Sequence, residues 1–155
     1  MVLLNANEMI QKPIIREYQP QDYTEVEKLW EKTGMSSSVR ADDQQVIQNT
    51  YDSGGKLFIL EDQFSGEIIG TSWLTDDGRR IYLHHFGILP KYQGKGFSKY
   101  LLKASLDFAI ANGKQIKIEV HRSNQKAINL YTKAGFKYLG DYDVFIIRDY
   151  QNLNQ

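Results

Sequence analysis

Residues 86–98 read Phe-Gly-Ile-Leu-Pro-Lys-Tyr-Gln-Gly-Lys-Gly-Phe-Ser, and this stretch decides the fold. It begins as an apolar strand, turns at Pro90 and passes through a short loop that contains Gly94 and Gly96. A strand, a glycine loop and a helix N-terminus in this order form a site for phosphate groups, because the first amides of a helix point at the ligand and the helix dipole is positive there. The helix is predicted from an apolar face made by Phe97, Leu101, Leu102, Leu106, Ala109 and Ile110.

The loop differs from the common nucleotide-binding motifs. A P-loop requires Gly-x-x-x-x-Gly-Lys-Ser/Thr, and a dinucleotide fingerprint requires Gly-x-Gly-x-x-Gly, but the residue three positions after Gly96 is Lys99. The pattern present is Gln93-x-x-Gly96-x-Ser98. It resembles the Gln/Arg-x-x-Gly-x-Gly/Ala loop of the GNAT N-acetyltransferase superfamily, which binds the pyrophosphate of acetyl-CoA. Taken alone, a Gly-x-Gly loop is more often an ordinary strand-to-helix turn.

A second pattern downstream supports the resemblance. Residues 115–121 alternate with period two and predict a strand. Residues 124–136 read Asn-Gln-Lys-Ala-Ile-Asn-Leu-Tyr-Thr-Lys-Ala-Gly-Phe, in which Asn124 is predicted to cap a helix and Gly135 to end it. This segment is similar to the family's second signature, Asn-x-x-Ala-x-x-Leu-Tyr-x-Lys-x-Gly-Phe. The two signatures occur in the family's order, and together they are a far stronger signal than either one alone.

Composition narrows the class of protein. The chain has 155 residues, 41% hydrophobic and 25% charged, which suits one globular domain. It contains no cysteine, which excludes disulfides, thiolate metal sites and an acyl-cysteine intermediate, and we expect no metal. There is no secretory signal pattern and no apolar run of transmembrane length, so we expect a cytoplasmic protein with no membrane partner. A monomer and a homodimer are both compatible with the sequence.

The formal net charge of zero hides an asymmetry. From Lys91 to Lys137, ten basic residues stand against two acidic ones, a net charge of +8, and the remainder carries −8. We expect Lys91, Lys95 and Lys99 to lie beside the phosphates of the coenzyme, and Lys103, one turn further along the helix, to be solvated. Nucleic-acid binding would rest on this row of lysines alone, and the neutral chain argues against it.

The order of predicted elements is that of a mixed α/β protein. It matches the family over residues 13–148, and the resemblance implies a twisted mixed sheet of about seven strands with helices on both faces. In that fold the strands containing Ile88 and Val120 diverge and hold the pantetheine arm between them. We expect an N-terminal extension at 1–12 and an N-acetyltransferase domain at 13–150. Besides the elements named above, the predicted strands are 14–18, 56–61, 67–74, 80–89, 137–139 and 142–148, and the predicted helices are 22–33 and about 42–51.

The resemblance assigns two groups of residues to acetyl-CoA. The main chain of Phe86, Gly87 and Ile88 is expected to pair with the pantetheine and the acetyl carbonyl. Ser98 replaces the usual Gly or Ala, and its hydroxyl can hydrogen-bond the pyrophosphate. The pyrophosphate is expected at Gln93, Gly94, Lys95, Gly96, Phe97 and Ser98.

Two residues of the second signature are also expected in the site. Asn124 is assigned to the pantetheine arm through its side-chain amide, a role compatible with helix capping. The resemblance places Tyr131 beside the sulfur, where a phenol can donate a proton to the leaving thiolate. The alternative for Tyr131 is a core aromatic residue whose hydroxyl has a structural role.

The base that deprotonates the acceptor is expected on the strand before the loop. His84 occupies the place of a histidine in the arylalkylamine members of the family, and neutral histidine can accept a proton near pH 7. Many members have a glutamate where this chain has Tyr82, so a water chain and Glu119 are alternatives to His84. His84 is equally compatible with a buried, hydrogen-bonded core histidine. Alternation predicts Tyr82, His84 and Phe86 on one face of the strand and His85 on the other.

We therefore expect an N-acetyltransferase that moves the acetyl group of acetyl-CoA directly to a primary amine of a small molecule or peptide. The alternative on the same fold is a non-catalytic acyl-CoA-binding sensor or interaction module. The acidic balance outside the basic segment favours a cationic acceptor. In the family the acceptor pocket is built by the first two helices, their loop and the final hairpin, which here contain Trp30, Met35, Asp42, Asp43, Tyr142 and Phe145.

Overall fold

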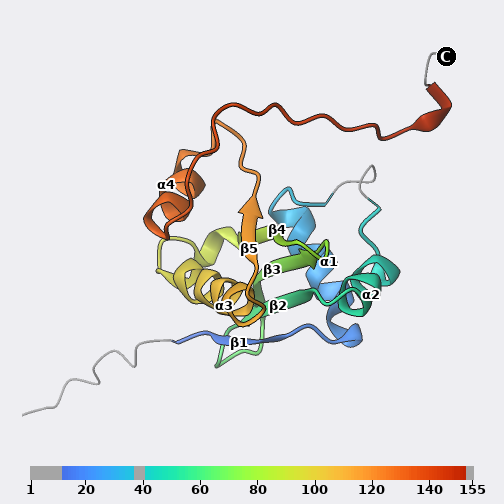
Figure 1. Ribbon diagram of the computed structural model, residues 1–155. Coiled ribbons are helices and arrows are strands. Elements are labelled where there is room, and N and C mark those ends of the chain that lie inside the picture. Colours follow the sequence, from blue (N-terminus) through green and yellow to red (C-terminus); the bar gives the residue numbers. More distant parts are fainter. Residues whose placement is uncertain (1–11, 37–40, 153–155) are drawn as a thin grey trace, which may run out of the picture. The chain divides into compact units, whose positions relative to one another are not determined.

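The computed structural model describes residues 12–36 and 41–152 and divides the chain into two compact units, which meet in sequence between Ile118 and Glu119 (Figure 1). Most of the predicted extension at 1–12 lies outside the described residues. The first unit contains β1 (Ile14–Glu17), α1 (Tyr23–Lys32), α2 (Gln44–Asp52), β2 (Lys56–Glu61), β3 (Ile68–Asp76), β4 (Arg80–Ile88), α3 (Phe97–Ala111) and β5 (Gln115–Ile118), and the second contains α4 (Gln125–Lys133).

The first unit is built on one five-stranded sheet in the order β1-β2-β3-β4-β5. The pairs from β1 to β4 are antiparallel, and β4 and β5 run parallel. A parallel neighbour requires a crossover connection, and α3 supplies it between β4 and β5. The mixed α/β class predicted from the sequence is thereby confirmed.

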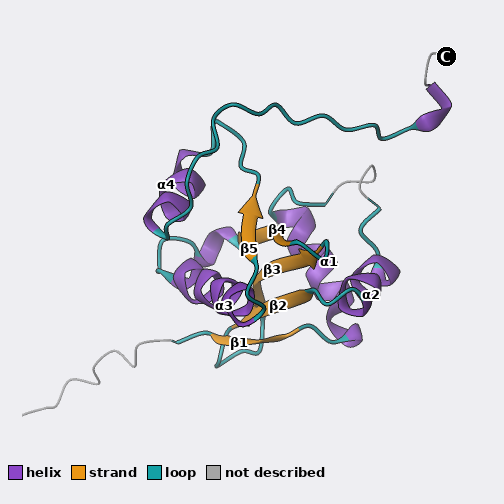
Figure 2. Cartoon of the chain, viewed as in Figure 1, coloured by secondary structure: helices purple, strands orange, loops and turns teal. Residues whose placement is uncertain are grey.

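Helices cover both faces of this sheet, as expected (Figure 2). On one face, α1 and α2 pack against β2 and β3 in a core that contains Trp30, Leu57 and Trp73. On the other face, α3 packs against a core that contains Leu60 and Ile88. The alternation of side chains along each strand sends neighbouring residues into these two different cores.

A β-bulge in β4 changes this alternation at one point. Thr71 pairs with Gly87 and Trp73 pairs with His84, so β4 has one more residue than β3 between these pairs. His85 adopts a left-handed backbone with φ 42° at the bulge. The prediction that Phe86 shares a face with His84 and that His85 lies opposite is therefore wrong.

The two histidines lie on the same face of β4. His84 pairs with Trp73, and directly paired residues share a face. The His85 ring lies 5.1 Å from the same Trp73 ring, between centroids. Phe86 instead packs on the core beside α3. The cause is the extra residue, because strict period two holds only while the two strands keep the same count.

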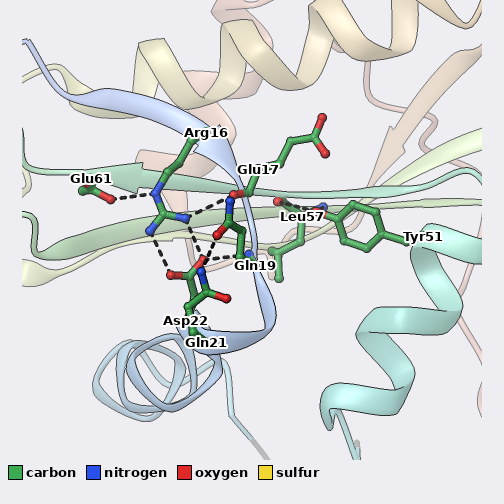
Figure 3. A network of polar contacts seen from close by, with 8 residues as sticks. All are labelled: Arg16, Glu17, Gln19, Gln21, Asp22, Tyr51, Leu57 and Glu61. Carbon is green, nitrogen blue, oxygen red and sulfur yellow. Dashed lines mark hydrogen bonds and ion pairs between the residues drawn. The ribbon is translucent and has the colours of Figure 1, made fainter.

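Arg16 connects β1 to β2 and to the turn before α1 through a network of hydrogen bonds (Figure 3). The guanidinium of Arg16 on β1 donates to Glu61 Oε2 on β2 at 2.7 Å and to both carboxylate oxygens of Asp22 at 2.7 and 2.9 Å. Burial raises the pKa of Asp22, but hydrogen bonds from Arg16 and from the main-chain N–H of Gln19 outweigh it, so the pKa is lowered. The paired charges fix the turn that leads into α1.

The second unit departs from the sequence prediction. Its described residues contain α4 and a short 3-10 turn at Tyr150–Asn152, but the segments 137–139 and 142–148 form no strand (Figure 2). The sheet thus has five described strands instead of about seven, and β5 ends at Ile118 instead of residue 121. β-Branched and aromatic residues give a segment strand propensity, but a strand also needs a hydrogen-bonded neighbour. Among the helices of the described residues, none combines the length and apolar character needed to cross a bilayer.

Candidate active site

The loop between β4 and α3 has the backbone that its glycines predict. Gly94 and Gly96 adopt left-handed conformations, with φ 76° and 79°, and Gly96 is the N-cap of α3. A Cβ at either position would meet no atom within 4 Å, so backbone conformation, not crowding, requires glycine here. The first amides of the 15-residue helix α3 begin at Phe97 and Ser98. This arrangement suits an anionic group at the helix N-terminus.

Side chains anchor the loop to the sheet. Tyr92 donates its hydroxyl hydrogen to Glu67 Oε2 at 2.8 Å, and Lys91 Nζ lies 2.9 Å from the same carboxylate. Gln93 donates its side-chain amide to the main-chain carbonyl of Ile88 at 2.9 Å. Lys91 and Gln93 therefore have structural contacts on the side of the loop that faces β3 and β4.

A hollow of about 390 Å³ lies along the start of α3. Its lining residues are Lys95, Gly96, Lys99, Tyr100 and Lys103. Three lysines around one hollow create a local positive charge suited to phosphate. Lys103 was expected in solvent, and it is 74% exposed and paired to Asp107 at 2.6 Å, although it also borders the hollow.

The end of β4 extends beyond the end of β5. The parallel pairing runs from Arg80–Gln115 to Leu83–Ile118 and stops there, while β4 continues to Ile88. Beyond Leu83, main-chain groups on this side of β4 are not used for pairing with β5. The divergence expected between the strands that contain Ile88 and Val120 stays a prediction, because Val120 lies beyond the end of β5, in the second unit.

The second unit presents the residues of the second signature on α4. Asn124 caps the helix by accepting a hydrogen bond from the main-chain N–H of Ala127 at 3.1 Å, as predicted. Gly135 follows the helix with φ 102°, also as predicted. Tyr131 is 5% exposed and meets Phe136 edge-on at 5.5 Å between ring centroids. Burial raises the pKa of Tyr131, so its hydroxyl keeps its proton at neutral pH.

Comparison with known proteins places these features in one family. The sequence model of the Acetyltransferase (GNAT) family matches residues 14–136, a range that includes both the glycine loop and α4. The chain belongs to the GNAT acetyltransferase family. This confirms the resemblance that the two signatures indicated.

Solved structures of low sequence identity share this GNAT fold. A GNAT-family acetyltransferase from Staphylococcus aureus Mu50 matches with a TM-score of 0.71 at 19% identity, over 81% of this chain and 83% of that chain. A GNAT-family protein from Streptococcus pneumoniae TIGR4 matches with a TM-score of 0.69 at 20% identity, over 88% and 99%. A GNAT-family acetyltransferase from Elizabethkingia anophelis, solved with acetyl-CoA bound, matches with a TM-score of 0.58 at 21% identity, over 81% and 76%.

The first unit of this GNAT protein brings His84 close to a hydroxyl and an aromatic ring. His84 Nε2 lies 2.9 Å from Thr75 Oγ1. The His84 and Tyr82 rings stack with centroids 4.3 Å apart, and Lys117 Nζ lies 5.1 Å from the centre of the Tyr82 ring. The Thr75 hydroxyl and the Tyr82 ring therefore orient the His84 side chain, one residue beyond the last β4 residue that pairs with β5.

His85 is a histidine of this site whose place the sequence did not predict. His85 Nε2 lies 3.0 Å from Asp42 Oδ2, and both atoms are buried. Asp42 had been assigned only to the general acceptor region, and His85 had been placed on the opposite face. A usable signal was the paired His84-His85 in a strand, because histidine is among the few residues that tolerate the left-handed backbone of a bulge.

Proposed function

We propose that this GNAT-family protein binds acetyl-CoA and transfers its acetyl group to the nitrogen of a primary amine. The observation that carries this proposal is the loop from Gln93 to Ser98, with two left-handed glycines at the N-terminus of a 15-residue helix. The pyrophosphate would lie at the amides of this first turn, and the lysine-lined hollow would neutralise further phosphate charge.

Some of the proposed acetyl-CoA-binding residues would bind through the main chain, and others through the side chain. Phe97 is 5% exposed and packs in the core, so it would contribute only its main-chain N–H, while Ser98 would add its hydroxyl. Phe86, Gly87 and Ile88 would bind the pantetheine and acetyl carbonyl through main-chain groups at the end of β4, beyond its pairing with β5. Asn124 would contribute its side-chain amide. The proposed catalytic domain spans 13–150.

The proposed reaction needs four proton transfers. His84 Nε2 or Nδ1 takes a proton from the acceptor ammonium, and the amine nitrogen then attacks the thioester carbonyl carbon. The C–S bond breaks as the tetrahedral intermediate collapses, and the Tyr131 hydroxyl donates a proton to the leaving thiolate. The remaining amine proton returns to the phenolate of Tyr131, and the imidazolium releases its proton to water. The chain contains no cysteine, in keeping with direct transfer.

Acidic residues on the α1 and α2 side favour a cationic acceptor. Burial raises the pKa of Tyr23, and the negative charges of Glu27, Asp43 and Asp42 raise it further. Three carboxylates thus act on one hydroxyl at this face of the sheet. An ammonium group approaching His84 from this side would meet negative charge, which favours its binding.

The test is release of coenzyme A thiol from acetyl-CoA in the presence of amines. Spermidine, tyramine, glucosamine and a peptide with an unblocked N-terminus cover the acceptor classes, and mass spectrometry identifies the acetylated product. We expect turnover with at least one, and a larger loss of kcat than of acetyl-CoA affinity in Tyr131→Phe. Tight acetyl-CoA binding with no turnover across the panel would instead identify an acyl-CoA sensor.

A further inference from the structure

The backbone of His85 is held by a chain of buried hydrogen bonds. Thr71 donates its hydroxyl hydrogen to the His85 carbonyl at 2.8 Å and accepts the indole N–H of Trp30 at 2.9 Å. Thr71 is fully buried, and Trp30 is 2% exposed. A left-handed non-glycine residue is strained, and it persists only where its surroundings fix it. β3 and α1 thus fix the bulge.

The side chain of His85 is also held in place, by two indole rings and a carboxylate. Its ring centroid lies 4.6 Å from Trp30 and 5.1 Å from Trp73, and the two indoles are stacked at 5.4 Å with an interplanar angle of 2°. The ring nitrogen Nε2 faces Asp42 Oδ2 at 3.0 Å. Because both atoms are buried, loss of either partner leaves a buried polar group without its counterpart, which is costly.

Asp42 stands immediately before the start of α2. The next residue, Asp43, is the N-cap of α2 and accepts the main-chain N–H of Val46 at 2.9 Å. The far half of α2 is held to the sheet separately, because Trp73 donates its indole N–H to Thr50 at 2.9 Å and the Tyr51 hydroxyl donates to the Leu57 carbonyl at 3.2 Å. The Asp42–His85 contact is thus the polar anchor at the N-terminal end of the helix.

We propose that Asp42 and His85 are positioning residues that hold the N-terminal end of α2 against the β4 bulge and thereby set the affinity for the acceptor. His85 is adjacent to His84 and on the same face of β4, which α1 and α2 cover. The phosphate loop is anchored elsewhere, through Glu67 and Ile88. The pair therefore acts on acceptor binding and leaves acetyl-CoA binding unchanged. This inference rests on the proposed acetyl transfer.

Two conservative variants test the pair. His85→Asn keeps a residue that tolerates the left-handed backbone and removes the imidazole, and Asp42→Asn removes the carboxylate charge. The acceptor is the amine of the four-member panel that is turned over fastest. We expect each variant to raise the acceptor KM about tenfold, while kcat and the acetyl-CoA KM change less than about twofold. The double variant should be no worse than either single one, because both remove the same contact.

Asp52→Asn is the matched control, since it makes the same change at the other end of α2, where Asp52 only accepts from Gln48 on the surface. It should leave all constants unchanged. An equal rise of the acceptor and acetyl-CoA KM values, a fall in kcat alone, or additive effects in the double variant would overturn the proposal.

A second measurement keeps the anchor testable if no panel amine is acetylated, an outcome that counts against the proposed function. Amide hydrogen exchange over residues 44–48 should be faster in His85→Asn and Asp42→Asn than in Asp52→Asn. Unchanged exchange in both variants would show that the pair does not hold α2, and would refute the inference independently of activity.

Discussion

The side-chain amide of Gln93 donates a hydrogen bond to the main-chain carbonyl oxygen of Ile88 over 2.9 Å. Ile88 is the last residue of β4, so this contact ties the glycine loop to the strand that precedes it. Gln93, the first residue of the family signature, therefore has a structural role in this chain. It fixes the start of the loop relative to the end of β4.

Replacing Gln93 with alanine should weaken acetyl-CoA binding about fivefold, because the loop loses this anchor, while the free energy of unfolding falls by only about 1 kcal/mol. Calorimetry and urea unfolding measure the two quantities. Gln45→Ala is the control, since Gln45 bonds only Asn49 on the exposed side of α2. Equal affinities in the Gln93 variant and the wild type would contradict the anchoring role.

Substitutions should distinguish a lysine that binds the coenzyme phosphates, Lys95, from a lysine that is solvated, Lys103. Lys95→Ala should raise the acetyl-CoA KM, and more so at low salt, because exposed charges are screened over about 8 Å at physiological ionic strength. Lys103→Ala should change it little, since the Lys103 ammonium is paired with Asp107 at 2.6 Å. Equal effects of the two substitutions would show that the lysines act only through general charge.

The pH–rate profile should depend on His84. If its imidazole is the base, activity rises with pH as the ring loses its proton. His84→Gln should remove this acid limb from the profile of kcat/KM for the acceptor. A limb retained with the same apparent pKa would assign the titration to the amine or to another group.

Acid stability should depend on the Arg16–Asp22 pair. The pKa of Asp22 is lowered in the folded state, so its stabilisation is complete above the unfolded value, about 3.9, and is lost as the pH falls through the folded value. Asp22→Asn should therefore destabilise the protein at pH 7 by about 2 kcal/mol and flatten the loss of stability below pH 4.

The control for Asp22 is Glu25→Gln. The carboxylate of Glu25 pairs with Lys28 at 2.9 Å, but the two side chains are 61% and 54% exposed. Such surface pairs contribute little, so this variant should unfold like the wild type at both pH values. Chemical denaturation between pH 2 and 7 compares the two variants, and identical curves would contradict the assigned role of Asp22.

The features that the sequence predicted depend on local chemistry. Asn124 caps α4 because its side chain reaches the Ala127 amide, and Gly96 is the N-cap of α3 in a left-handed conformation that glycine adopts without steric cost. Both properties belong to the residue and its near neighbours, so pattern and motif are enough to find them. The family signatures then extended this local information to the order of the elements and to the mixed sheet.

The features that were missed depend on distant partners. The bulge at His85 requires Thr71 and Trp30 to hold a strained backbone, and strict alternation assumes that no residue is inserted. The Asp42–His85 contact joins residues 43 positions apart, which no local pattern encodes. Residues 142–148 are rich in β-branched and aromatic residues, yet a strand also depends on a neighbour that the segment itself does not specify.

The central claim is that the Gln93–Ser98 loop binds the phosphates of acetyl-CoA. Calorimetric titration of acetyl-CoA into the wild type, Gly96→Glu and Gly78→Glu tests it most directly. Gly78 is the matched control, because it has φ 83° and open space around its Cβ position, as Gly96 does, but lies in the turn between β3 and β4. We predict binding by the wild type and Gly78→Glu and none by a folded Gly96→Glu, in which the carboxylate repels the phosphates. Wild-type affinity in Gly96→Glu would contradict the account.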